Sequence, residues 1–591
     1  MKPIALDCEV YPNYFLVSFK RVHDGKTVSV EARGKDGKLS NEQIASLKSK
    51  LKKTTFGFNS INYDLPILAA ALKGLSCERI HQVSDAIIEQ RLRSWQTMRQ
   101  FELQDFERDH FDLMEPSPGV MISLKLYGAR MHSKHLQDLP IEPGTVLTEQ
   151  QMDEIKTYCE NDLDTTIELY HAVADRIQLR EIFGRRFKLD ADLRSRSDAQ
   201  MAETVVKYML SSGTAGRRAP KIKLDTTYKY EIPRNIQFIT PELQEVYEAI
   251  KEQEFGLDKK GSISLPKEIR DIKIKLGQST YQLGIGGLHS TEKQQAAVPT
   301  EGQILADRDV ESYYPSIIIH EDLAPKHLKG DFTTTYFKIL KLRLRAKHGG
   351  DKTTADGLKI AVNGTFGKLG SKYSFLYSPD LLLQVTLTGQ LTLLMLIERL
   401  ELAGISVVSA NTDGFVSLID KADYKKYDDI CFDWELDTGY KLEETRYKAL
   451  YSRDVNNYLA ITEDGAKGKG IFTKAGLMKN PQMQICAEAV EAYLIRGTPI
   501  EDTIRGCTDQ TKFLTVRSVT GGALWRGEYL GRVVRWIWSA DGEKIVYKKN
   551  GNKVATSDGA RPIMTLGEFP LDIDYERYIQ NAKDILESVG C

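Results

Sequence analysis

Two well-separated segments of the chain each end in an aspartate that could bind a divalent cation. Asp309 follows the apolar residues 303–306, and Asp413 follows the apolar residues 405–409; both segments are typical of β-strands. If the two strands belong to one sheet, the two carboxylates lie side by side and can share metal ions. Lys359 lies between them in the chain, on a basic segment. The order carboxylate, cation, carboxylate is the one that nucleotidyl transfer requires.

These segments resemble motifs A, B and C of the family B DNA polymerases, usually written DxxSLYP, KxxxNSxYG and DTDS. The corresponding sequences here are DVESYYP from Asp309, KIAVNGTFG from Lys359 and NTDG from Asn411. The resemblance implies that Asp309 and Asp413, with the carbonyl of Val310, bind two Mg²⁺ ions, for which Mn²⁺ can substitute. Asn411 replaces the first aspartate of motif C, whereas Asp413 keeps the second, which is the direct metal ligand in the family.

A nucleotide site is expected next to this metal site. Residues 336–347 and a second segment that opens at Lys359 have helical patterns, and a two-glycine turn at residues 349–350 would join them into a hairpin. The resemblance implies that this hairpin is the fingers region, which holds the dNTP triphosphate, and that Tyr314 excludes a ribose 2′-hydroxyl. A solvated basic helix and a core tyrosine paired with Tyr313 are the alternatives. The residues expected to bind the nucleotide are Tyr314, Arg343, Lys347, Lys359 and Asn363.

Two further segments resemble DNA-binding elements of the same family. The segment YQLGIGGLH from Tyr281 is placed like the YxGG-type loop between exonuclease and palm, although its glycine spacing differs; a structural turn is the alternative. The sequence NNY, which ends at Tyr458, takes the place of the KxY motif and lacks its lysine. The resemblance implies DNA contacts by Tyr281, Gly286, Gly287 and Tyr458.

The N-terminal part of the chain carries a second set of carboxylates. Asp7 and Glu9 are two apart in a strand-like segment and share a face, and Tyr158 and Asp162 are four apart in a helical segment. Together with NSINYD, which begins at Asn59, they resemble the motifs DxE, NxxxFD and YxxxD of proofreading exonucleases. The resemblance implies that two Mg²⁺ ions bind the carboxylates Asp7, Glu9, Asp64 and Asp162, that Tyr158 orients a water, and that Asn59 and Tyr63 contact DNA.

Two other features have more than one interpretation. Asp112 matches none of the three exonuclease motifs, and a turn residue or local cap is the favoured interpretation. Aromatic and basic residues alternate over 525–538, which fits either a surface that follows a nucleic-acid backbone or a β-hairpin with aromatic packing. The position of this segment in the chain favours a thumb that holds duplex DNA.

Composition limits the class of protein. The chain has 591 residues, of which 41% are hydrophobic and 28% charged, and its formal net charge is −1, so a DNA-binding surface needs locally clustered cations. Seven cysteines without paired spacing predict a reducing compartment with neither disulfides nor zinc. We find no apolar run that approaches the roughly eighteen residues that span a bilayer, and residues 1–10 do not match a signal peptide. We therefore expect a cytoplasmic protein, in the host cytoplasm if the source is viral.

We expect an α/β and α+β multidomain fold, in which an RNase H-like domain is followed by a right-hand polymerase. The compact layout looks most like that of bacteriophage replicative enzymes. The predicted boundaries are a 3′-5′ exonuclease domain at 1–180, a helical linker at 181–280, palm with motif A at 281–335, fingers at 336–370, palm with motif C at 371–479 and thumb at 480–591.

The spacing of the motifs predicts how synthesis begins. Residues 310–358 separate Asp309 from Lys359, and residues 368–410 separate Gly367 from Asn411, which leaves no room for the insertions of protein-primed family members. We expect a monomer that extends a nucleic-acid primer on primer-template DNA with dNTPs, aided by a helicase-primase or a processivity factor and without a membrane. The rivals are a DNA-binding replication or repair factor with exonuclease activity only, and an RNA-directed or translesion polymerase.

Overall fold

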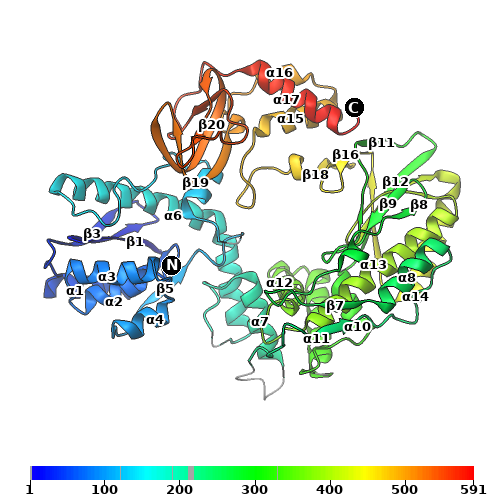
Figure 1. Ribbon diagram of the computed structural model, residues 1–591, viewed down its shortest axis with the longest axis horizontal. Coiled ribbons are helices and arrows are strands. Elements are labelled where there is room, and N and C mark those ends of the chain that lie inside the picture. The colour runs from blue at the N-terminus through cyan, green and yellow to red at the C-terminus, as the bar shows by residue number, and fades with distance from the viewer. Residues whose placement is uncertain (1–2, 120, 190, 211–217, 329) are drawn as a thin grey trace. The chain divides into compact units, whose positions relative to one another are not determined.

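The computed structural model describes residues 3–119, 121–189, 191–210, 218–328 and 330–591. Contacts divide the chain into two compact units. The first comprises Met1–Ser197, Ala475–Ile485 and Ile504–Tyr578, and the second comprises Asp198–Lys474, Cys486–Thr503 and Ile579–Cys591. Within the described residues, five sheets combine with helices in these units (Figure 1), so the expectation of a mixed α/β, multidomain chain is confirmed.

The first unit is built on a five-stranded sheet with the order β3-β2-β1-β4-β5. Strands β1, β2 and β3 are antiparallel neighbours, whereas β4 runs parallel to both β1 and β5. Helix α6 packs against β1 and β2 on one face, and α2 and α3 cover the other (Figure 1). The elements are β1 (Ile4–Tyr11), β2 (Tyr14–Arg21), β3 (Thr27–Arg33), α1 (Asn41–Leu51), β4 (Thr54–Gly57), α2 (Asp64–Leu72), α3 (Cys77–Ile88), α4 (Ser94–Gln100), β5 (Asp109–Asp112), α5 (Leu124–Arg130) and α6 (Glu149–Arg186).

Local signals explain where helix α6 begins and which side it buries. The Thr148 hydroxyl accepts from the main-chain N–H of Gln151, whose side chain in turn accepts from the N–H of Thr148, so a capping box satisfies the first turn. Ile155, Cys159 and Leu163 follow at helical spacing and are fully buried. This register turns Tyr158, Cys159 and Asp162 toward the sheet.

A second sheet completes the first unit, with the order β21-β19-β20-β22. Arg535 of β20 is fully buried and donates to the main-chain carbonyls of Ser133 and Lys134 at 2.7 and 3.0 Å. Trp536 and Trp538 are also buried, so the aromatic packing of a β-hairpin is confirmed at these two positions. The elements are β19 (Thr515–Trp525), β20 (Glu528–Glu543), β21 (Val546–Tyr547) and β22 (Ala560–Pro562), with α15 (Gln484–Arg496), α16 (Ile500–Arg505) and α17 (Tyr575–Ser588) nearby in the chain.

The predicted thumb, residues 480–591, does not coincide with one compact unit. Its segment Ile504–Tyr578 belongs to the unit that contains Met1–Ser197. The hydrogen bonds of Arg535 and the packing of α5 on β19 and β20 explain this grouping. Where the functional boundaries lie stays a prediction.

The second unit contains a seven-stranded antiparallel sheet with the order β15-β12-β14-β13-β10-β9-β8. Helices α13 and α14 pack against it. A four-stranded sheet, β11-β16-β17-β18, lies in the same unit. The strands are β6 (Thr227–Lys229), β7 (Glu254–Gly256), β8 (Ile274–Leu276), β9 (Ser279–Gln282), β10 (His289–Ser290), β11 (Gln295–Ala297), β12 (Gln303–Val310), β13 (Ser406–Asn411), β14 (Gly414–Asp420), β15 (Leu442–Tyr447), β16 (Ala449–Asp454), β17 (Asn457–Ile461) and β18 (Ala466–Lys469).

The helices of the second unit include the expected hairpin between motifs A and B. Helix α11 is followed after a short turn by α12, and the two pack together, so the hairpin is confirmed. The second helix opens at Lys352 rather than at Lys359, because the Asp351 side chain accepts from the N–H of Thr354 and caps it there. The helices are α7 (Asp198–Met209), α8 (Pro241–Glu252), α9 (Lys267–Arg270), α10 (Tyr313–His320), α11 (Gly330–His348), α12 (Lys352–Leu369), α13 (Pro379–Leu402) and α14 (Tyr424–Thr438).

Helix α13 corrects the expectation that no segment approaches membrane-spanning length. Among the described residues it is long and apolar enough to cross a bilayer, but 83% of its apolar window is buried inside the structure. Tyr313 of α10 donates to the carbonyl of Gly389 at 2.5 Å, and the Trp434 indole of α14 donates to that of Thr392 at 2.8 Å. The apolar sequence of α13 is therefore that of a core helix.

Candidate active sites

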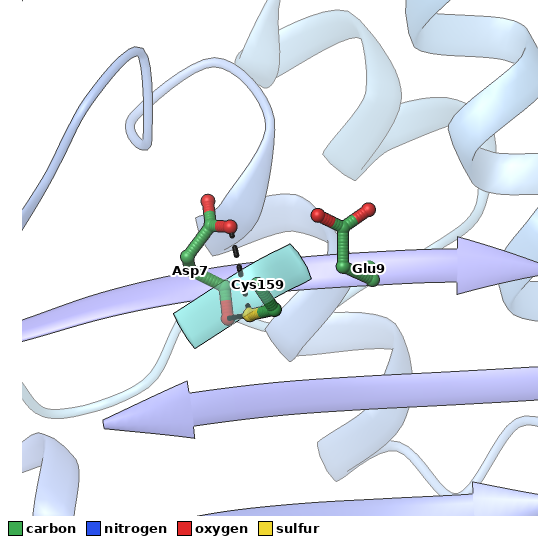
Figure 2. A group of neighbouring side chains, drawn as sticks. All are labelled: Asp7, Glu9 and Cys159. Atoms are coloured by element: carbon green, nitrogen blue, oxygen red, sulfur yellow. Dashed lines mark hydrogen bonds between the residues drawn. The ribbon is translucent and has the colours of Figure 1, made fainter. Parts of the chain in front are cut away.

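The first candidate site lies on strand β1. Asp7 and Glu9 alternate with Cys8 and leave the same face of the strand, the face on which α6 packs. Figure 2 shows the two carboxyl groups on one side of β1, with Cys159 of α6 beside them. The Cys159 thiol donates to Asp7 Oδ2 at 3.6 Å, and the ligand atoms of the three side chains lie within 4.8 Å of one another. This arrangement can hold a metal ion.

Helix α6 adds a third carboxylate, and helix α5 adds a cation that the sequence motifs did not include. Lys125 Nζ donates to Asp162 Oδ1 at 2.8 Å and Oδ2 at 3.0 Å, and also to the Tyr158 hydroxyl. Burial and then the charge of Asp162 raise the pKa of Asp7 to about 7, while Lys125 opposes this shift. The charges of Asp7, Glu9 and Asp162 therefore influence one another in one site.

The fourth predicted carboxylate, Asp64, reaches the site from the start of α2. Its Oδ1 accepts from the main-chain N–H of Cys8 at 2.8 Å, so it lies against the strand between Asp7 and Glu9. Burial, followed by the charge of Asp7, raises the pKa of Asp64 well above its ordinary value. The structure thus brings Asp64 close to β1.

The two residues expected to contact DNA flank Asp64. Asn59 has a left-handed backbone, with φ of 58°, and its N–H donates to Asp112 at 2.9 Å. Asp112 also accepts from the N–H of Ile61 at 2.9 Å and from that of Met114, two residues further on, at 2.9 Å; the second bond confirms its interpretation as a turn residue. The Tyr63 hydroxyl hydrogen-bonds to Ser84 of α3 at 2.8 Å, and its ring packs on the core. DNA contacts by Asn59 and Tyr63 stay predictions.

The donor set of this site fits a hard divalent cation. Carboxylate oxygens are the ligands that Mg²⁺ and Mn²⁺ prefer. Burial and the neighbouring charges of Asp7 and Asp162 also raise the pKa of Glu9 well above its ordinary value. A cation between the carboxylates would relieve this repulsion and return them to the ionised state. Asp7, Glu9, Asp64 and Asp162 are therefore suited to hold Mg²⁺.

The raised pKa of Asp7 predicts how stability depends on pH. Between its ordinary value of 3.8 and about 7, the folded protein retains a proton on Asp7 that the unfolded chain has lost. In EDTA, the free energy of unfolding should therefore fall by more than ~1 kcal/mol as pH rises through this window. Thermal melts of wild type and Asp7→Asn would measure it. The slope should be smaller in the variant and in wild type with Mg²⁺; equal slopes in all three would contradict the assignment.

The second candidate site is formed where β12 and β14 meet. The two strands are antiparallel neighbours with Asp309 opposite Gly414, and Asp413 lies in the turn that precedes β14. The N–H of Val310 donates to the carbonyl of Asp413 at 2.8 Å, which ties the two motifs together. Burial and then the charge of Asp309 raise the pKa of Asp413. The predicted strand before Asp413 is β13, and β14, which follows Asp413, lies between it and β12. The two aspartates are thus held at one end of the β12–β14 pair within one sheet.

Gly414 makes room for the Asp309 carboxylate. A Cβ atom on Gly414 would lie 2.0 Å from Asp309 Oδ1, a distance that no real contact permits. A side chain at this position would therefore displace the Asp309 carboxylate. The carboxylate of Asp309 therefore lies directly over the start of β14.

The aspartates line a cavity of about 460 Å³ that also contains cations. Lys467 and Lys469 are two apart on β18, and both line this cavity. Lys469 is opposite Tyr458 in the β17–β18 pairing, with its Nζ 6.0 Å from the centre of the tyrosine ring. A neighbouring strand thus provides a lysine beside Tyr458, although the sequence NNY lacks one. Alternation along β18 predicts that the two lysines share a face, but only the strand register shows that Lys469 lies opposite Tyr458.

A second cavity, of about 330 Å³, borders the same aspartate. Asp413 lines both cavities, and the second is otherwise lined by residues of α10, α11 and α12 and the turn before α10. Of the residues predicted to bind the nucleotide, Tyr314, Arg343, Lys359 and Asn363 all line it. Three chain segments that are distant in sequence therefore converge on one cavity beside a candidate metal ligand.

Tyr314 is fixed in this cavity by contacts on two sides. Its ring stacks on Phe366 with centroids 4.4 Å apart, and its hydroxyl donates to the carbonyl of Gly286 at 2.7 Å. Tyr313, by contrast, is buried. Tyr314 stacks on Tyr313 as well, at 6.1 Å, so it combines the aromatic pairing with a position at the cavity wall.

The two predicted phosphate-binding residues of α11 differ in their contacts. Arg343 Nη1 donates to the Ser312 hydroxyl at 2.6 Å, at the wall of the second cavity. Lys347 lies outside that lining, with its Nζ 3.5 Å from Glu311 and 3.4 Å from Glu443. A triphosphate contact by Lys347 would require it to leave these carboxylates.

Gly364 replaces the serine of motif B for a packing reason. A Cβ atom there would lie 2.7 Å from the Cβ of Ala202 in α7. Helices α7 and α12 pack closely at this point. Gly364 therefore serves helix packing, while Asn363, the preceding residue, faces the cavity.

The glycine-containing loop after β9 contacts Tyr314 and Thr412, whereas Tyr281, at the start of this segment, lies in the core. The N–H of Thr412 donates to the carbonyl of Leu288 at 2.7 Å, and a Cβ on Gly287 would lie 2.8 Å from Thr412 Cγ2. Gly286 accepts the hydrogen bond from Tyr314. Tyr281 is fully buried in the core, so a direct DNA contact by its ring gains no support.

No protein-family profile matches the sequence, and no curated protein gives a significant match. Among solved structures, the chain is similar to the family B DNA polymerase from the hyperthermophilic archaeon Pyrobaculum calidifontis. The sequence identity is 13%, the match covers 100% of this chain and 78% of that chain, and the TM-score is 0.40. The function of this chain must therefore be inferred from the geometry of its own side chains.

Proposed function

We propose that this protein is a template-directed DNA polymerase with a 3′-5′ proofreading exonuclease. The polymerase activity is supported by one observation above all: Asp413 lines two cavities. The first also contains Asp309, and the second is lined by the aromatic and basic side chains that suit a nucleoside triphosphate. A pair of carboxylates next to such a cavity is the arrangement that metal-dependent nucleotidyl transfer requires.

In the proposed synthesis reaction, Asp309 and Asp413 hold two Mg²⁺ ions, with the Val310 carbonyl as a further ligand. When bound, Mg²⁺ would activate the primer 3′-hydroxyl and neutralise the negative charge of the leaving pyrophosphate. Arg343 and Lys359 face the triphosphate from the second cavity, with Lys347 as an additional cation.

The remaining residues of the two cavities orient the substrates. Tyr314, held between Phe366 and Gly286, occupies the position at which a ribose 2′-hydroxyl would clash. Lys469 and Tyr458 lie on the first cavity, where the primer strand must enter. The cation and the aromatic ring suit a phosphate backbone and a base.

The proposed exonuclease uses the β1 site. Asp7, Glu9, Asp64 and Asp162 hold two Mg²⁺ ions, and the Tyr158 hydroxyl, fixed by Lys125, orients the attacking water. The strand order β3-β2-β1-β4-β5, with β1 at the centre, supports an RNase H-like domain. The strained loop at Asn59 borders this site and is a place where the 3′ end of a strand can be held.

The finer parts of the proposal concern the setting in which the enzyme works. We propose a monomeric right-hand polymerase of bacteriophage type that acts in the cytoplasm and extends a nucleic-acid primer, assisted by a helicase-primase or processivity factor. The short spacing between the motifs supports the mode of priming. The gate at Tyr314 favours dNTPs over ribonucleotides as substrates, and the full set of exonuclease carboxylates favours a proofreading enzyme over the translesion alternative.

A primed template, Mg²⁺ and dNTPs test the proposal directly. We expect stepwise extension of a labelled primer, and digestion of the primer from its 3′ end when dNTPs are omitted. Digestion without any extension over a range of Mg²⁺ and Mn²⁺ concentrations would favour the rival, a replication or repair factor with exonuclease activity only. Absence of both activities would refute the proposal.

Gly414→Ala provides a more local test of the polymerase site. The added Cβ would displace the Asp309 carboxylate, so we expect extension to fall by about tenfold or more while digestion is unchanged. The matched control is Gly302→Ala, because a Cβ atom on Gly302 would meet nothing closer than Thr300 Oγ1, at 4.0 Å. Equal extension rates for the two variants would show that Asp309 does not need this space.

A further inference from the structure

Asn411 leaves the first cavity with one carboxylate fewer than the motif C pattern would give. Its side chain is occupied by local contacts: Nδ2 donates to the carbonyl of Val455 at 3.1 Å, and Oδ1 accepts from the Thr412 hydroxyl at 3.1 Å. Asn411 therefore holds the turn between β13 and β14. It brings no negative charge to the cavity that Asp309 and Asp413 line.

Asp307 brings a carboxylate into this cavity from a different strand. It lies two residues before Asp309 on β12, so the two side chains leave the same face of the sheet. Both line the cavity together with Asp413. Arg308, between them, leaves the opposite face and pairs with Glu444, so its charge is already compensated there.

The surroundings of Asp307 make a charge at this position costly. The residue is only 8% exposed, and Leu305 and Val416, its neighbours on the sheet, belong to an apolar cluster. The Asp307 carboxylate accepts a hydrogen bond from the Tyr447 hydroxyl, and an amide oxygen would accept this bond equally well. An uncharged side chain would therefore suit the fold better.

We propose that Asp307 supplies the third negative charge of the cation-binding group that Asp309 and Asp413 form, in place of the carboxylate that Asn411 lacks. This inference rests on the proposed polymerase function. Asp307 acts as a positioning residue: its charge draws divalent cations into the cavity and holds their hydration shell beside the two ligands. The third negative charge is then provided by Asp307 on β12 and not by the residue at position 411, at the end of β13.

Mn²⁺ binding measures this role without reference to activity. The parent protein is the full chain with Asp7→Ala and Asp162→Ala, so that the β1 site does not dominate the signal, and free Mn²⁺ is followed by electron paramagnetic resonance. In this parent, Asp307→Asn is expected to raise the dissociation constant for Mn²⁺ by about tenfold. Adding Asn411→Asp to Asp307→Asn is expected to bring it back to within about threefold of the parent.

One control variant separates the charge inside the cavity from the loss of any carboxylate. Asp420→Asn removes an exposed charge at the far end of β14. It is expected to bind Mn²⁺ like the parent. Circular dichroism checks folding, and Asp307→Ser serves as a second neutral variant if Asp307→Asn does not fold.

The outcomes distinguish this inference from the proposed function. If Asp309→Ala abolishes Mn²⁺ binding but Asp307→Asn leaves it unchanged, the role of Asp307 is refuted while the polymerase site stands. An equal loss in Asp307→Asn and Asp420→Asn would also refute it, because the effect would then not depend on a charge inside the cavity. If Mn²⁺ binding is the same in the parent and in Asp309→Ala, both the role of Asp307 and the proposed metal site at Asp309 and Asp413 are refuted.

Discussion

Replacing Asp309 by alanine is expected to reduce primer extension on the order of 10³-fold or more, while digestion stays within about twofold of wild type. Asp309 and Asp413 are the carboxylates that meet between β12 and β14, and the loss of one leaves no pair to share the metal ions. Digestion should survive because Asp7 and Glu9 lie in the other compact unit. Single-turnover extension of a labelled primer by an excess of enzyme measures the effect.

Asp420→Ala is the matched control for Asp309→Ala. Asp420 lies at the opposite end of the β12–β14 pairing, opposite Gln303, and is exposed. This variant should extend the primer at the wild-type rate. Extension by Asp309→Ala within about tenfold of wild type would contradict a catalytic role for this carboxylate.

Replacing Asp7 by alanine is expected to have the reverse effect. Digestion of single-stranded DNA should fall on the order of 10³-fold or more, with extension of a paired primer nearly unchanged. Asp7 interacts with several other groups of the site: it contacts Cys159, and its pKa depends on the charges of Asp162 and Lys125. Release of labelled nucleotides in the absence of dNTPs measures the rate.

Asp24→Ala, an exposed position of the same unit, is the control for Asp7→Ala. It should digest DNA like wild type. If Asp7→Ala also abolished extension, with melting behaviour like that of wild type, the assignment of the two activities to two separate sites would be wrong. If Asp7→Ala still digests DNA at the wild-type rate, β1 does not carry the nuclease site.

The sequence predicted the elements that carry the proposed metal-binding residues because local patterns determine them. Alternation on β1 places Asp7 and Glu9 on one face, and the apolar segments before Asp309 and Asp413 are strands of one sheet. The helical hairpin of α11 and α12 also follows from periodicity and the turn between them. Within this hairpin only the start of α12 was wrong, because the cap at Asp351 acts eight residues before Lys359.

Other residues of the sites depend on tertiary contacts that no local pattern contains. Lys469 reaches Tyr458 through the register of β17 and β18, and Lys125 reaches Tyr158 and Asp162 from a separate helix. Tyr281, conversely, has the sequence position of a DNA-binding residue but is fully buried. The two-residue spacing between Asp307 and Asp309 is visible in the sequence, but only the structure shows that both residues line one cavity with Asp413.

The central claim is that Asp309 and Asp413 bind metal ions together. Anomalous diffraction from crystals of Asp7→Ala grown with primer-template DNA, a dNTP and Mn²⁺ tests it most directly. We predict an Mn²⁺ peak bonded to carboxylate oxygens of both Asp309 and Asp413 at about 2.1 Å. Mn²⁺ bound to only one of these residues, or to neither, in crystals that contain the nucleotide would contradict the proposed site of synthesis.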